Sequence, residues 1–129
     1  MRARDRDLPP GAGAEYGLAH GLVGIGRADE RRLRRFAELP DGAFVWTRTT
    51  EGMYFLGRIS GPCRDEAAAE RAVGLAHVRA AVWMDRPFGE AEVPPAVAAT
   101  FARGGRNFQR THGEAVERRT AELWRAARS

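Results

Sequence analysis

The sequence predicts a small α+β domain with a curved, largely antiparallel sheet or barrel and helices packed at its edges. Two runs of aromatic and β-branched residues, 43–50 and 53–60, flank an "EG" dipeptide that is typical of a hairpin turn. A further apolar run follows at 76–84, and 113–129 has the spacing of an amphipathic helix. With 129 residues, 43% of them hydrophobic, the chain has the size of one domain that needs no disulfides.

The first half of the chain gives the clearest element boundaries. A Pro/Gly-rich arm of irregular structure is expected over residues 1–17, followed by a single domain over 18–129. The apolar run 20–26 is bounded by glycines and predicts a buried strand. Residues 27–40 predict a helix with Asp29 as its N-cap and a proline at its end.

The second strand of the hairpin is expected to end at Gly61–Pro62, because proline cannot donate a hydrogen bond to a sheet. The remaining elements follow in order: a loop or short helix over 63–74, a strand over 76–84, a Pro-rich connection over 85–95, a helix over 95–105, a short extended segment over 106–111 and a terminal helix over 113–129.

Composition favours an anionic partner. The net charge is +4, the pI is near 10.4, and all 21 basic residues are arginines. The single cysteine, Cys63, excludes an intramolecular disulfide and a cysteine-based zinc site, and it fits a cytoplasmic compartment. No apolar run is long enough for a membrane span, and the charged N-terminus is unlike a signal peptide.

The sequence offers no catalytic machinery. His20, His77 and His112 are far apart, and none has a second metal ligand at helical spacing. No nucleophile elbow or phosphate-binding loop is present, and Cys63 has no partner that the sequence can name. We therefore expect a non-enzymatic protein without a metal or cofactor.

Alternation along the strands places arginines on the same faces as large aromatic residues. The three sets that share a face are Phe44, Trp46 and Arg48; Tyr54, Leu56 and Arg58; and His77, Arg79, Ala81 and Trp83. Such a mixed face could be a solvated exterior on which arginine stacks on aromatic rings. It could equally be a pocket that sandwiches a flat base.

The stretch "RGGRNFQR" has the side chains that nucleic-acid contact needs. Its members are Arg103, Arg106 and Arg110 for charge, Asn107 and Gln109 for base edges, and Phe108 for stacking. The alternative is a helix C-cap followed by an edge strand.

In this order, "GLVGIG", "DGAFVWTR", "YFLGRISGP" and "HVRAAVW" resemble the PUA-like superfamily, most closely its EVE-like members from modification-dependent restriction systems. The resemblance covers roughly residues 18–111. It implies a curved β-barrel with helices at the rim. It also implies binding of nucleic acid, with a modified base flipped into an aromatic pocket. Arg27 and Cys63 stand where members often carry aromatic residues, so one pocket wall would be missing or come from elsewhere.

Carried onto this chain, the resemblance implies a base pocket of Trp46, Tyr54, His77, Arg79 and Trp83, to which the residues themselves add Phe108. Backbone and base-edge contacts are expected from Arg48, Arg103, Arg106, Asn107, Gln109 and Arg110. Replacing Trp46 or Trp83 should then weaken modified-base binding selectively. His77 and Arg79 could instead be structural, through hydrogen bonds and a buried ion pair.

The leading hypothesis is a reader of a modified base in DNA or RNA, with modified DNA favoured, linked to restriction or phage defence. Either the protein works alone, or a separately encoded nuclease or motor protein supplies the chemistry. One alternative is a protein-interaction or regulatory subunit of a defence complex that uses Leu123 and Trp124 of the terminal helix. Another is a small enzyme or ligand-binding protein that uses the same pocket.

Overall fold

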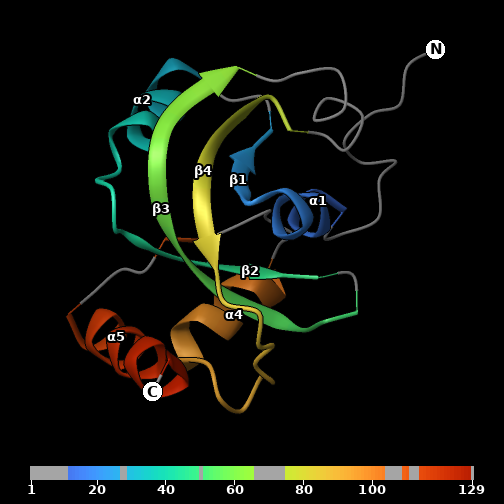
Figure 1. The fold of residues 1–129 in the computed structure, drawn as a ribbon, viewed down its shortest axis with the longest axis vertical. Helices are drawn as coiled ribbons and strands as arrows, with labels where there is room; N and C mark the ends of the chain where they lie inside the picture. The colour runs from blue at the N-terminus through green and yellow to red at the C-terminus, as the bar shows by residue number, and fades with distance from the viewer. Residues whose placement is uncertain are drawn as a thin grey trace.

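A curled antiparallel sheet with the strand order β1-β4-β3-β2-β5 forms the centre of the molecule (Figure 1). The structure is a computed structural model that describes residues 12–26, 29–49, 51–65, 75–103, 109–110 and 114–128. The strands are β1 (Leu22–Ile25), β2 (Phe44–Arg48), β3 (Tyr54–Asp65), β4 (His77–Trp83) and β5 (Gln109–Arg110). The helices are α1 (Ala12–His20), α2 (Glu30–Glu38), α4 (Pro95–Arg103) and α5 (Glu114–Arg128). The prediction of an α+β fold with a curved antiparallel sheet is confirmed at this level.

Local signals placed most of these elements correctly. Asp29 caps α2, because its carboxylate accepts a hydrogen bond of 2.8 Å from the Arg32 backbone N–H. Gly42 and Gly52 have φ of 90° and 86°, the left-handed backbone that tight turns require, and the Gly52 turn is the one that the "EG" dipeptide predicts. The prediction of an irregular arm up to residue 17 is wrong in its last part, where α1 begins at residue 12.

The predicted end of the third strand at Gly61–Pro62 is also wrong, because β3 runs on to Asp65. The pairing between β3 and β4 shifts register between Ile59 and Cys63. Residues in such a bulge need no partner in the hydrogen-bond ladder, so proline is tolerated there. A bulge also bends a strand, and β3 and β4 curve together in Figure 1.

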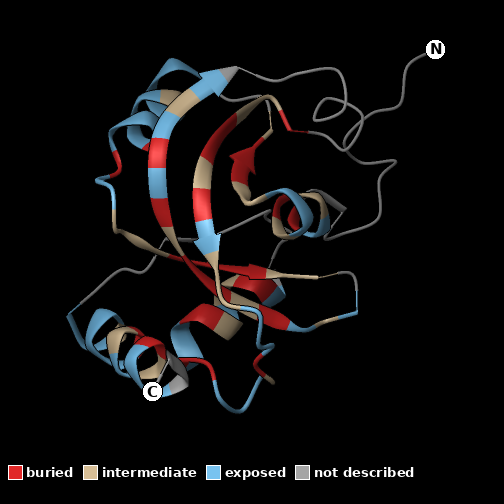
Figure 2. Cartoon of the chain, in the orientation of Figure 1, coloured by how far each residue is buried: buried red, intermediate tan, exposed pale blue. Residues whose placement is uncertain are grey.

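The sheet buries residues on both faces, and each face has its own hydrophobic cluster. The α4/α5 face carries a cluster formed with these two helices: Trp46, Tyr54, Leu56, Phe88, Val93, Val97, Phe101 and Trp124. The α2 face carries the second: Val23, Ile25, Phe36, Leu39, Val45, Ile59 and Ala81, with Trp83 packed against it. Buried bands therefore follow β3, β4 and β2 in Figure 2.

The terminal helix α5 is part of this packing. Trp124 is 8% exposed and meets the Phe44 ring edge-on, with centroids 5.8 Å apart. Leu123 and Val116 are partly buried against the same cluster. Among the described helices, none combines the length and the apolar character that crossing a bilayer requires.

Candidate nucleic-acid interface

Trp46 and Tyr54 lie inside the core and do not line an open pocket. Trp46 is 0% exposed, its Nε1 donates a hydrogen bond of 3.2 Å to the Thr120 hydroxyl of α5, and its ring meets Phe88 edge-on. Tyr54 is 1% exposed and meets Phe101 of α4 edge-on. Neither ring offers a free face on which a base could stack.

Arginine stacking on the α4/α5 face is part of the same packing. The Arg58 guanidinium lies 4.7 Å from the Phe44 ring centroid and 5.6 Å from that of Trp124, and its Nε donates to the Gly42 carbonyl. Both rings belong to the core cluster or pack against it. The mixed aromatic and arginine face is therefore a covered face here, which neither alternative from the sequence anticipated.

Arg79 joins the sheet to the end of α2. Its side chain is 4% exposed, and its Nε donates a 2.7 Å hydrogen bond to the Gly61 carbonyl in the bulge of β3. Its Nη1 donates to the carbonyls of Phe36, Ala37 and Leu39. These carbonyls belong to the last turn and the C-cap of α2, where a cation is favourable, and the Phe36 carbonyl also accepts the Leu39 backbone N–H. Nη2 also pairs with Asp41 at 3.1 Å. Arg79 therefore makes the hydrogen bonds of the structural alternative, whereas the Asp41 side chain of its ion pair is 71% exposed rather than buried.

Trp83 is the one tryptophan that remains partly exposed. It stands on the α2 face of β4 and extends across the sheet to both neighbouring strands. Its Nε1 donates a 2.9 Å hydrogen bond to the Leu22 carbonyl of β1. Its six-membered ring lies over Gly57 of β3, where an added Cβ would stand 2.5 Å from Cε3. The indole is thus held in one orientation before any ligand arrives.

Replacing Gly57 with alanine should displace this indole. The new methyl group overlaps the ring, and such overpacking costs about 1–3 kcal/mol of stability. We expect a lower urea midpoint and a red-shifted tryptophan emission. Gly89→Ala is the matched control, because its Cβ would meet only a Glu92 carboxylate oxygen at 4.0 Å. Equal stability of the two variants would contradict this view of Trp83.

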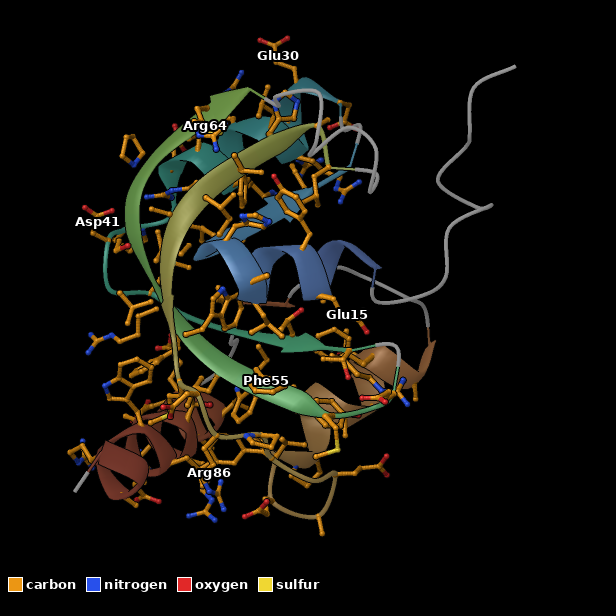
Figure 3. The ribbon with its side chains drawn as sticks, turned by 45° about the vertical axis from the view of Figure 1, so that its right-hand side comes forward. Glu15, Glu30, Asp41, Phe55, Arg64 and Arg86 are labelled. Atoms are coloured by element: carbon orange, nitrogen blue, oxygen red, sulfur yellow. The ribbon has the colours of Figure 1, made fainter. Side chains whose placement is uncertain are left out.

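Phe55 is a residue that the sequence did not single out. It pairs with Thr47 across β2 and β3, so both stand on the α2 face with Gly57. Phe55 is partly exposed, and Figure 3 labels it on β3 near the hairpin. The signal was available: strand alternation places Phe55 beside the Gly57 position over which Trp83 lies. His77 is partly exposed at the start of β4 and shares this face by the same alternation.

The other predicted contact residues are dispersed or lie outside the described residues. Arg48 stands on the α4/α5 face, 5.7 Å from the Tyr54 ring centroid, so it is across the sheet from Trp83. Among the described residues its buried Nε has no hydrogen-bond partner. Arg106, Asn107 and Phe108 lie outside the described residues, as do the side chains of Arg103, Gln109 and Arg110.

The connection from β4 to α4 is held by charge. Arg86 pairs with Glu92 at 2.7 Å and stacks 4.4 Å from the ring centroid of Phe88. The hydrogen bond from Arg86, followed by one from the Gly89 N–H, lowers the pKa of Glu92 below its ordinary value. This loop fixes Phe88 against Trp46 in the core.

A hollow of about 460 Å³ opens between the start of β2 and α5. Its lining consists of Gly42, Ala43, Phe44, Glu114, Glu117, Arg118 and Ala121. Two carboxylates against one arginine make this rim a poor site for phosphate. In the described part of the chain, no three His, Cys, Asp or Glu side chains gather as a metal site.

The fold and this geometry define a class: a small α+β domain with a curled antiparallel sheet and an anchored, partly exposed tryptophan on one face. Comparison with models of known protein families, with curated proteins and with solved structures finds no match to the chain.

Proposed function

We propose that the protein is a non-enzymatic nucleic-acid-binding module of the PUA-like, EVE-like kind that reads a modified base in DNA or RNA. The base would stack on Trp83 on the α2 face of the sheet, and arginines would contact the phosphates. The expected context is restriction or phage defence in the cytoplasm, with the chemistry supplied by a nuclease or motor activity.

The observation that carries this proposal is the anchored indole of Trp83. Stacking on an aromatic side chain contributes about 1–3 kcal/mol per base, and it is strongest when the ring is already oriented. Two fixed points, the Leu22 carbonyl and Gly57, orient this ring while leaving it partly exposed. Phe55 on the same face adds a second partly exposed ring.

The test is binding to short duplex and single-stranded oligonucleotides, each with one methylated, hydroxymethylated or otherwise modified base, at about physiological salt. We expect a preference for one modified base over its plain counterpart. Trp83→Ala should weaken that binding about 5- to 150-fold, which corresponds to the stacking free energy. Trp83→Phe should lose less, because a ring remains.

Val82→Ala is the matched control, since Val82 is 51% exposed on the opposite face of the same strand. It should bind as the unchanged protein does. Tryptophan fluorescence gives a second readout, because Trp46 and Trp124 are buried and only Trp83 can meet a base. Equal affinities for modified and plain bases, with equal binding by the Trp83 and Val82 variants, would end the reader proposal.

The alternative of a protein-interaction subunit that uses α5 is not favoured. It needs a free apolar stripe, whereas Leu123 and Trp124 already pack against the sheet. The Thr120 hydroxyl on the same helix is bonded to Trp46.

A further inference from the structure

The solvent side of α2 is a concentrated positive surface. The helix has the sequence ERRLRRFAE, and its four arginines, Arg31, Arg32, Arg34 and Arg35, are all exposed. Side chains three and four positions apart are neighbours on a helix, so Arg31, Arg34 and Arg35 share one side. Glu30 and Glu38 are the only acidic residues within the helix.

These arginines make few ion pairs with other residues that the structure describes. Arg34 meets Glu30 at 3.5 Å, an exposed pair that contributes little. Among the described residues, no carboxylate forms an ion pair with Arg31, Arg32 or Arg35. Two α5 arginines differ from these, because Arg118 pairs with Glu114 and Arg119 pairs with Glu122.

The helix that carries this charge is held firmly. Phe36 is 3% exposed in the cluster of the α2 face, Asp29 caps the first turn, and Arg79 binds the last carbonyls. An anchored helix presents its arginines in a fixed arrangement, which reduces the entropy cost of binding an extended anion. Exposed Arg64 of β3 lies at the same end of the molecule as Glu30 (Figure 3).

We propose that the solvent side of α2 is the phosphate-binding surface of this protein. The ligand is the backbone of a polyanion, contacted by Arg31, Arg34 and Arg35. That this polyanion is nucleic acid rests on the proposed function. The helix packs on the same sheet face that carries Trp83, so one strand could leave its base at the indole and its phosphates on α2.

The test compares two double variants of equal charge. Arg31→Gln/Arg35→Gln removes two α2 arginines, and Arg118→Gln/Arg119→Gln removes two from α5. Glutamine has nearly the helix propensity of arginine, and all four positions are exposed, so both variants should fold, as circular dichroism would verify. On phosphocellulose, a resin that carries phosphate groups alone, the α2 variant should elute at lower salt than the α5 variant.

With an oligonucleotide as the ligand, the plot of log affinity against log salt should become less steep by about 1–2 units for the α2 variant only. Equal elution and equal slopes for the two variants would overturn the proposal. Such a result would not count against the reader function. The change in Trp83 fluorescence on binding and the preference for a modified base would be the same in both variants. Conversely, the protein could show no preference for any modified base, while only the α2 variant elutes early from phosphocellulose. The phosphate-surface proposal would then stand although the reader proposal fails.

Discussion

Replacing Arg79 with alanine should lower the free energy of unfolding by about 3–5 kcal/mol, the largest effect we expect from a single charged residue. Its guanidinium satisfies the Gly61 carbonyl in the β3 bulge and the Phe36 and Leu39 carbonyls at the end of α2. Each buried acceptor that loses its donor costs about 1–3 kcal/mol. Urea unfolding followed by circular dichroism measures the loss.

Two further variants separate the causes. Arg79→Lys keeps the charge but presents one ammonium group in place of a planar fork, so it should restore only part of the stability. Asp41→Asn should cost less than about 1 kcal/mol, because the Asp41 side chain is 71% exposed. If the Asp41 variant lost as much as Arg79→Ala, the ion pair rather than the carbonyls would hold the junction.

Replacing Trp46 with alanine should also destabilise the whole fold, by about 3–5 kcal/mol. The indole is fully buried, packs edge-on against Phe88 and bonds to Thr120, so its loss leaves a cavity between β2, α5 and the loop before α4. The urea midpoint should fall well below that of Trp83→Ala, which removes a partly exposed ring. Thr120→Val should cost about 1–3 kcal/mol, because it leaves the buried Trp46 Nε1–H without an acceptor.

The sequence had predicted a different result for Trp46, a selective loss of base binding. Measuring both the stability and the base affinity of Trp46→Ala distinguishes the two expectations. A Trp46→Ala variant with unchanged stability and a lower affinity for modified bases alone would return Trp46 to the base pocket.

Local chemistry made much of the fold predictable. The Asp29 cap, the two glycine turns and the apolar runs each depend on neighbours in the chain, so α2 and the β2–β3 hairpin could be placed from sequence. Alternation also assigned Phe44, Trp46 and Arg48 correctly to one face. Alternation does not say what covers that face, and α5 does so from the far end of the chain.

The predictions that were wrong share one cause, which is contact with residues far away in the sequence. A proline usually ends a strand, but β3 continues past Pro62 through a bulge. Arg79 of the neighbouring strand β4 donates a hydrogen bond to the Gly61 carbonyl in this bulge. The sequence suggested a pocket role for Trp46, but Thr120 and Phe88 pack against its ring in the core. Of the pocket candidates, Trp83 and His77 stay partly exposed on one face, because no described helix covers them fully.

The contact of Trp83 with Gly57 has a consequence for how this protein can diverge. Hydrophobic cores accept exchanges among residues of similar volume, so the apolar positions can drift during evolution. The pair Gly57–Trp83 allows far less, because it depends on a missing Cβ. Arg79 is also restricted, because its planar guanidinium binds several backbone carbonyls at once. Distant relatives should therefore be sought by the Gly57–Trp83 pair, whose members must change together or stay, and by an arginine at position 79, rather than by the apolar pattern around them.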